Sequence, residues 1–163
     1  MDKIKKGASI VFRSPRLFFC TMNKPYTNTT RRKLIILIVD DNRYFVDRMI
    51  GLLDDNTHIG YIHIASEYDE AFQFITEEKP DLVLLDINLP GRNGIELLRK
   101  IRVNENGCKV VMITNHADDY YRQQCKELGA DHFLDKSNDF AKVAVIINQV
   151  GEEFDSYPLE NAC

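Results

Sequence analysis

Three carboxylates follow strongly apolar runs of the chain, at positions where a parallel sheet would gather polar side chains. Asp40 and Asp41 directly follow the run LIILIV at residues 34–39, and Asp86 lies near the end of DLVLLDI at residues 81–87. Carboxylates brought together repel one another, and a divalent cation relieves that repulsion. Oxygen ligands with no histidine or cysteine beside them favour Mg²⁺, or Mn²⁺, over softer metals.

Two further polar side chains end runs of the same kind. Thr114 ends KVVMIT at residues 109–114, and Lys136 ends HFLDK at residues 132–136. A cation, an ammonium group and a hydroxyl group around a carboxylate can together neutralise and orient a phosphoryl group. The residue types therefore predict that Asp86 acts as a nucleophile and forms an acyl phosphate.

Five short runs of branched apolar residues predict the strands that carry these side chains. Three runs are continuously apolar, which indicates strands covered on both faces, and the other two are more polar or shorter, which suits sheet edges. The predicted strands are residues 34–39, 59–65, 81–87, 109–114 and 132–136, of which the second and the fifth are the edges.

Apolar residues at helical spacing fill the gaps between the predicted strands, and the last such stripe starts at Phe140 and reaches Ile147. This alternation predicts five βα units over residues 34–153, an α/β doubly wound parallel sheet. With the most apolar strands in the centre, the strand order is 2-1-3-4-5, which is flavodoxin-like. All strands then end at one edge, where the polar side chains converge.

The motifs IVDD, LVLLDINLPGRNGIELLRKIR, VVMITN and GADHFLDK occur in this order within residues 34–153. In sequence and spacing they resemble the receiver domain of two-component response regulators, which has a CheY-like (βα)5 fold. The resemblance implies that Asp86 accepts a phosphoryl group from a sensor histidine kinase or a histidine phosphotransfer protein. It also implies signalling by conformational change and protein contacts in a phosphorelay.

The same resemblance implies roles for the residues around Asp86. Asp40, Asp41 and Asp86 would bind Mg²⁺, with the main-chain carbonyl of Asn88 as a further ligand. The residues implied for phosphoryl transfer and switching are Asp86, Lys136, the hydroxyl of Thr114 and the aromatic ring of Phe133. Plain packing on an edge strand is the alternative for Phe133.

Four residues depart from the receiver pattern or vary within it. Ser137 follows Lys136 where these domains usually have a proline, often in cis, so a trans or rearranged turn is expected. Asn115 stands where a small residue is usual and would narrow the approach to Asp86. Asn88, Asn115 and His116 are the candidate modulators of the lifetime of the phosphoryl group.

Charge divides the 163 residues into two unequal parts. The net charge of −4 combines nine basic residues and one acid in residues 1–33, a net of +8, with a net of −12 in the remainder. An acidic domain argues against nucleic-acid binding through a broad basic surface. Residues 1–33 are expected to be a basic, flexible arm outside the fold, with contact to nucleic acid or an anionic membrane as the alternative.

The ends of the chain predict a stand-alone receiver. Residues 154–163 read as a frayed tail, too short for a DNA-binding or catalytic output domain. No apolar run approaches the roughly 20 residues that span a bilayer, and four scattered cysteines suit a reducing compartment. A cytoplasmic protein with no membrane span is therefore expected.

Output through protein contacts is expected on the face formed by about residues 118–153, where the resemblance places partner binding. The last helix carries apolar residues around much of its circumference, which indicates either a homodimer face or a wide core-facing stripe.

Two other functions remain open. One is a degenerate receiver that only binds proteins, and the other is a Mg²⁺-dependent aspartyl phosphatase. Asn88 counts against the phosphatase, which generally needs a second aspartate at that place.

Overall fold

The structure is a computed structural model that describes residues 32–104 and 107–156. Of the predicted basic arm, only Arg32 and Lys33 belong to these residues. The other residues of the arm, and residues 157–163 of the predicted tail, lie outside the described part of the chain.

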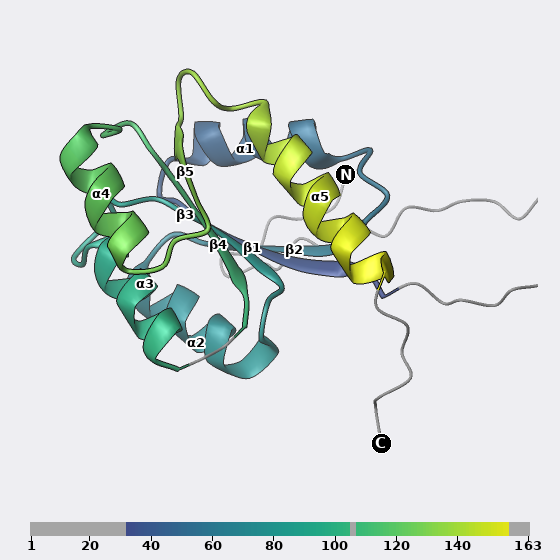
Figure 1. The fold of residues 1–163 in the computed structure, drawn as a ribbon, viewed down its shortest axis with the longest axis horizontal. Helices are drawn as coiled ribbons and strands as arrows, with labels where there is room; N and C mark the ends of the chain where they lie inside the picture. The colour runs from purple at the N-terminus through teal and green to yellow at the C-terminus, as the bar shows by residue number, and fades with distance from the viewer. Residues whose placement is uncertain (1–31, 105–106, 157–163) are drawn as a thin grey trace, which may run out of the picture.

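Within the described ranges, five parallel strands form one sheet in the order β2-β1-β3-β4-β5, which confirms the predicted topology and both predicted edges (Figure 1). The strands are β1 (Leu34–Val39), β2 (Ile59–Ala65), β3 (Leu82–Leu85), β4 (Lys109–Thr114) and β5 (His132–Asp135). The branched apolar residues that predicted the strands suit extended backbone between two covered faces.

Among the described residues, five helices cover the sheet on both faces. They are α1 (Arg43–Leu53), α2 (Tyr68–Glu78), α3 (Gly94–Val103), α4 (Asp119–Glu127) and α5 (Lys142–Ser156). Helices α1 and α5 lie on one face, and α2, α3 and α4 lie on the other (Figure 1). The result is a three-layer sandwich with the sheet in the middle.

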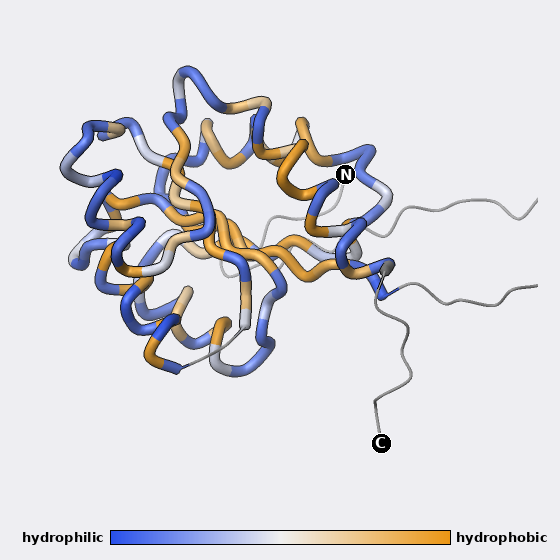
Figure 2. The backbone as a smooth tube through the Cα atoms, viewed as in Figure 1, coloured by the Kyte–Doolittle hydropathy of each residue, from blue (hydrophilic) through white to orange (hydrophobic). Residues whose placement is uncertain are grey.

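Strand alternation divides the core into two clusters, one for each face of the sheet. In β1, Leu37 and Val39 pack towards α2, α3 and α4, whereas Ile36 and Ile38 pack towards α1 and α5. The central strands are the most continuously hydrophobic part of the chain (Figure 2). Both sides of each central strand are therefore buried, as the unbroken apolar runs predicted.

Element ends differ from the predicted ones in β3, in β5, which ends at Asp135 and not at Lys136, and in α5. β3 is shorter than the predicted residues 81–87, although the Asp81 main chain still bonds to Ile35 and Lys109 on either side. The Asp81 carboxylate accepts from Ile35 N at 2.8 Å and pairs with Arg32. Phe140 precedes α5, which begins at Lys142. α5 then continues to Ser156, past residue 153, and Phe154 packs against the core.

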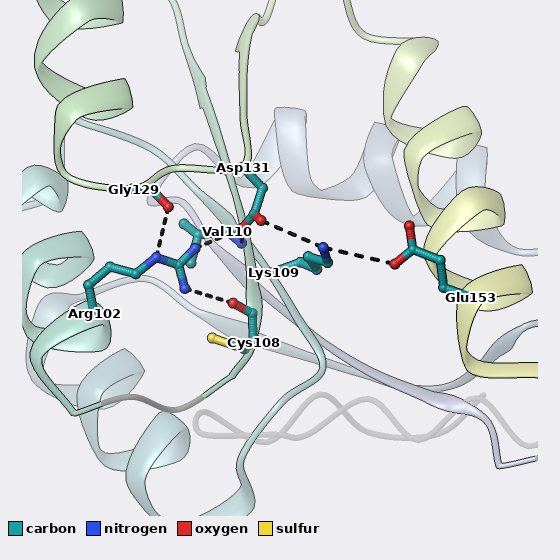
Figure 3. A network of polar contacts seen from close by, with 7 residues as sticks. All are labelled: Arg102, Cys108, Lys109, Val110, Gly129, Asp131 and Glu153. Carbon is teal, nitrogen blue, oxygen red and sulfur yellow. Dashed lines mark hydrogen bonds and ion pairs between the residues drawn. The ribbon is translucent and has the colours of Figure 1, made fainter. Parts of the chain in front are cut away.

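A polar network fastens the sheet edge at which the strands begin (Figure 3). The guanidinium of Arg102, in α3, donates to the main-chain oxygens of Gly129 and Cys108 and to the Asp131 carboxylate, at 2.7–2.8 Å. Asp131 also accepts from Val110 N at 2.7 Å. One side chain thus ties α3, the start of β4 and the approach to β5 together, at the edge opposite the strands' carboxyl ends.

No helix in the described ranges is both long and apolar enough to cross a membrane.

Candidate functional site

Asp40 and Asp41 stand where β1 passes into α1. The Asp40 main-chain N–H still bonds to Ala65 O of β2, at 3.0 Å, so Asp40 prolongs the strand. Its Oδ1 atom accepts from Asn42 N at 2.9 Å, and the Asn42 side chain in turn accepts from Phe45 N, capping α1. The sequence Asp-Asp-Asn therefore ends a strand, turns the chain and begins a helix, which fixes both carboxylates at the sheet edge.

Asp86 follows β3, next to Asp40. Its N–H bonds to Val39 O at 3.0 Å, and its Oδ1 atom accepts a long bond, 3.3 Å, from Asn88 N. The chain then returns closely on itself, since Gly94 N donates to Ile87 O at 2.8 Å and Gly94 lies against the Asp86 carbonyl oxygen. The loop from residue 87 to residue 93 thus returns to the Asp86 main chain and holds it in place.

The three predicted carboxylates do come together. Asp40, Asp41 and Asp86 each offer an oxygen within 4.8 Å of the others. Asp40 and Asp86 are 2% and 5% exposed, whereas Asp41 is exposed to solvent. Burial raises the pKa of the Asp40 carboxyl, and the adjacent ammonium group of Lys136 only partly opposes this. Two of the three charges thus lie where water screens them poorly.

A divalent cation fits this arrangement. Asp40 Oδ2 is a buried oxygen for which no hydrogen-bond donor with good geometry lies among the described residues, although Lys136 Nζ lies 2.6 Å away. Three carboxylates and one ammonium group leave a net charge of −2 at the site. Hard oxygen donors with that charge suit Mg²⁺, which keeps several of its waters.

Lys136 reaches the carboxylates from the end of β5. Its Nζ atom lies 2.6 Å from Asp40 Oδ2 and 2.6 Å from Asp86 Oδ2, and the residue is 7% exposed. The main chain is held as well, because Lys136 N donates to Thr114 O at 3.0 Å. A buried ammonium group between two carboxylates is therefore attached to the ends of three strands at once.

Thr114 ends β4 and is fully buried. Its Oγ1 atom accepts from His116 N at 3.2 Å, while Asn115 and His116 are exposed. The structure therefore places the predicted switch hydroxyl at the same sheet edge as Asp86 and Lys136, with the two predicted rate modulators outside it.

Phe133 lies three residues before Lys136, in β5 opposite Met112, and packs half-buried against the core on the α2–α4 face. The Arg122 guanidinium of α4 stacks on its ring at 4.8 Å from the centroid and donates to Phe133 O. Lys136 instead contacts residues on the α1 face. The Phe133 side chain thus lies on the opposite face of the sheet from the Lys136 side chain, and the Arg122 guanidinium covers its ring.

The turn after Lys136 is held by carboxylates. Asp135 Oδ1 accepts from Ser137 N at 2.7 Å, and Asp139 Oδ2 accepts from Asp135 N at 3.1 Å. The Ser137 bond is the main cause of the lowered pKa of Asp135, and the bond from Lys142 is the main cause of the lowered pKa of Asp139. No cis peptide bond occurs in the described residues, so the expected trans turn at Ser137 is found.

Two residues of the site cannot be identified from the sequence pattern. Gly94 was read only as part of a motif, although a side chain there would collide with Asp86. Phe45 has helical spacing with Met49 and Leu53, which predicts a core-facing position in the first helix, yet its ring centroid lies 4.6 Å from Lys136 Nζ. Helical spacing indicates that Phe45 is buried, but it cannot show which atom from another element meets the ring.

The family model for the response regulator receiver domain matches residues 36–148. Sporulation initiation phosphotransferase F of Bacillus subtilis (strain 168) is 42% identical over 99 residues, which are 60% of this chain and 78% of that protein. A receiver domain protein (CheY-like) from Methanospirillum hungatei JF-1 superposes with a TM-score of 0.68 at 28% identity. That match covers 76% of this chain and 98% of the other.

A third relative is much longer than the matched region. The protein-glutamate methylesterase/protein-glutamine glutaminase of Idiomarina loihiensis is 34% identical over 103 residues, which are 62% of this chain and 26% of that protein. This chain thus spans about a quarter of the length of that relative, and the match covers only part of either chain.

Proposed function

The chain belongs to the response regulator receiver domain family, and on that premise we propose that Asp86 is the residue on which it accepts a phosphoryl group. The donor in this proposal is a phosphohistidine of a sensor histidine kinase or of a histidine phosphotransfer protein. The phosphorylated domain then signals through a changed protein surface within a phosphorelay.

One observation carries the assignment of Asp86. Lys136 Nζ lies 2.6 Å from Oδ2 of both Asp40 and Asp86, at an edge where three carboxylates lie within 4.8 Å of one another. Asp86 Oδ2 thus accepts a hydrogen bond from the ammonium group of Lys136. Among the described residues, Oδ1 accepts only the long bond from Asn88 N. Oδ1 therefore keeps lone pairs for attack on phosphorus.

The chemistry is a transfer between two nucleophiles. A carboxylate oxygen of Asp86 forms a bond to phosphorus, and the bond from phosphorus to the imidazole nitrogen breaks. The imidazole leaves as the neutral ring with the bonding electron pair, and its other nitrogen keeps its proton. Lys136 neutralises charge on the phosphoryl oxygens as the transfer proceeds.

Asp40, Asp41 and Asp86, with the main-chain carbonyl of Asn88, would hold the Mg²⁺ of this family. When bound, the ion supplies charge neutralisation for the phosphoryl oxygens. Thr114 and Phe133 are proposed as the switch pair on β4 and β5, with Arg122 over the Phe133 ring in the present state. Asn88, Asn115 and His116 are proposed to set the lifetime of the acyl phosphate, since each stands at an exposed position close to the site.

The proposed output partner is a protein that binds about residues 118–153, the surface made by α4, β5 and α5. Tyr120 and Val145 are 70% and 55% exposed there and are available to pack against such a partner, although Tyr44 of α1 and Val103 of α3 are exposed to a similar extent elsewhere. The curated relative of highest identity above is called a phosphotransferase, and that name supports a role in passing phosphoryl groups on.

The phosphatase and binding-module alternatives make different predictions from this proposal. A phosphatase of this kind would need an acid or base two residues after the nucleophile, and the amide of Asn88 can serve as neither. A binding module would need neither the buried carboxylates nor Lys136, whose burial costs free energy that a purely structural site could avoid.

The test is incubation of the full chain with acetyl phosphate and Mg²⁺, followed by reductive trapping with borohydride and mass spectrometry. The proposal requires at most one phosphoryl group per chain, trapped at position 86 and absent from an Asp86→Asn variant. An Asp47→Asn variant, altered at an exposed position of α1, is the matched control and should label normally.

Each alternative has its own outcome. Many turnovers of varied phosphoesters would identify a phosphatase. No label from any donor, with no response to Mg²⁺, would identify a binding module.

A further inference from the structure

The ammonium group of Lys136 has a third neighbour besides the two carboxylates. Its Nζ atom lies 4.6 Å from the centroid of the Phe45 ring, and Phe45 is only 5% exposed. The contact is between a buried cation and an aromatic face, which attract each other electrostatically, more strongly where water is excluded. Lys136 therefore lies in a three-sided cage made by Asp40, Asp86 and Phe45.

The Phe45 ring also packs against a second aromatic ring. Phe140 packs edge-on against it, with centroids 5.8 Å apart and ring planes at 82°. Phe140 belongs to the same connection between β5 and α5 as Lys136, four residues further on. The guanidinium of Arg48, one turn after Phe45 in α1, covers the Phe140 ring at 4.4 Å from its centroid.

We propose that Phe45 is a positioning residue for Lys136, whose ring face holds the ammonium group between Asp40 and Asp86 in place for an incoming phosphoryl oxygen. This inference rests on the proposed function of Asp86. It adds a residue of α1, which the sequence pattern assigned only to the core, to the apparatus of phosphoryl transfer.

Such a holder is needed because the main chain alone does not fix the ammonium group. Asp135 and Asp139 fix the turn, but four rotatable bonds separate the Lys136 backbone from Nζ. The two carboxylates, each 2.6 Å from Nζ, hold the ammonium group in the position that suits them. Phosphoryl transfer instead requires the ammonium group to contact a new oxygen, that of the phosphoryl group.

A ring face suits this requirement better than a third oxygen would. It attracts the cation without a directional hydrogen bond, so Nζ can move towards a phosphoryl oxygen and still lie over the ring. The ring also excludes water from one side of the ammonium group, which strengthens its attraction to a developing negative charge.

The test keeps the shape of the side chain and changes only its charge distribution. Phenylalanine at position 45 is replaced by its mono-, di- and trifluorinated analogues, which progressively weaken the negative potential of the ring face. The rate of acceptance on Asp86 from acetyl phosphate at saturating Mg²⁺ should fall stepwise, by about tenfold over the series. The same analogues at Phe72, which packs on the opposite face of the sheet, should change the rate by less than about twofold.

A second measurement needs neither metal nor donor. The ε-methylene protons of Lys136, assigned by their absence in a Lys136→Arg variant, should resonate upfield because of the ring current of Phe45. Phe45→Tyr should keep this shift and Phe45→Leu should abolish it. This readout shows whether the ring lies over the ammonium group, whereas the fluorinated series shows whether the charge distribution of the ring matters, which a merely structural role would not require.

The results separate this inference from the proposed function. Equal rates across the fluorinated series, with the Lys136 shift present, would show that Phe45 only packs and would overturn the inference. An unshifted Lys136 signal in the natural protein would overturn it as well. If the natural protein takes no label, the proposed function fails, and the positioning role for phosphoryl transfer fails with it, whereas the Lys136 shift still shows whether the ring lies over the ammonium group.

Discussion

Gly94, the first residue of α3, lies directly against the main-chain carbonyl of Asp86, so that a Cβ atom at position 94 would overlap that oxygen. The contact is maintained by the bond from Gly94 N to Ile87 O. The backbone of the proposed phosphoryl acceptor is thereby set by a residue eight positions later that carries no functional group.

Gly94→Ala should therefore damage both stability and chemistry. Alanine favours a helix by about 1 kcal/mol over glycine, but the collision requires Asp86 or α3 to move. We expect a net loss of about 1–3 kcal/mol in the free energy of unfolding, on the scale of overpacked sites, and a slower acceptance rate at Asp86. Urea denaturation and labelling with acetyl phosphate measure the two effects. Gly51→Ala in α1, with nothing within 4 Å of its Cβ, should instead stabilise the protein.

Gly151→Ala should destabilise the protein for a different reason. The ring of His58, from the connection between α1 and β2, occupies the space in which a Cβ on Gly151 of α5 would lie. We expect a loss of about 1–2 kcal/mol despite the gain in helix propensity. Adding His58→Ala should recover most of that loss, because the space is then vacated, and a double-mutant cycle measures the coupling. Additive effects would show that the two residues do not meet.

Arg102→Lys should reduce stability and leave phosphoryl transfer intact. Lysine cannot reproduce the planar donors that reach Gly129, Cys108 and Asp131 together. We expect the free energy of unfolding to fall by about 1–3 kcal/mol, with an acceptance rate within about twofold of normal, because this network lies at the opposite edge of the sheet. Arg99→Lys, at an exposed position of the same helix, is the control for the change of residue type. A large loss of acceptance in Arg102→Lys would contradict this division between stability and chemistry.

Asp40→Asn should stabilise the metal-free protein and abolish its response to Mg²⁺. Burial raises the pKa of Asp40 above its ordinary value of 3.8, so the charged form costs stability. The cost is absent below 3.8 and complete above the raised pKa, because the folded state binds more protons between the two values. We expect a gain of about 1 kcal/mol at pH 7 that disappears as the pH falls.

The comparison for this prediction is Asp41→Asn, since Asp41 is exposed and bears no such burial cost. It should lose the stabilisation by Mg²⁺, which for the natural protein is about 2.7 kcal/mol at one hundred times the dissociation constant. Without metal it should show no gain. Thermal denaturation with and without Mg²⁺, over a range of pH, separates the two variants, and equal behaviour would contradict the assigned burial.

Ser137→Pro should not improve the site, although proline is usual at this place in the family. Ser137 N donates to Asp135 Oδ1, and proline has no N–H to donate. The pKa of Asp135 should then rise towards 3.8, because that bond is the main cause of its lowered pKa. In the natural protein, Asp135 stabilises the fold above pH 3.8, and this contribution is lost as the pH falls through the lowered pKa. The variant should therefore be less stable than the natural protein at neutral pH. NMR titration of the Asp135 carboxyl measures the change, and Ser137→Ala, which keeps the N–H, should leave its pKa lowered.

The sequence by itself determined the sheet and the polar residues at its edge. Unbroken apolar runs require strands buried on both faces, so the apolar pattern separates the central strands from the edges. The order 2-1-3-4-5 then follows from matching that pattern to the known flavodoxin-like order. Asp40, Asp86, Thr114 and Lys136 follow from this, because parallel strands all end at one edge and the residues after them must meet there. The polar side chains of the site could therefore be predicted from the sequence wherever each of them directly follows or ends a strand.

Only the tertiary structure decided which side chains from different elements touch. Helical spacing shows that Phe45 is buried and that Gly151 lies within a helix, but not that one meets Lys136 and the other His58. The same holds for Arg102, which reads as an exposed helical cation until its three partners are seen in place. Periodicity reports the face of an element, whereas the atoms opposite that face depend on how elements tens of residues apart pack together.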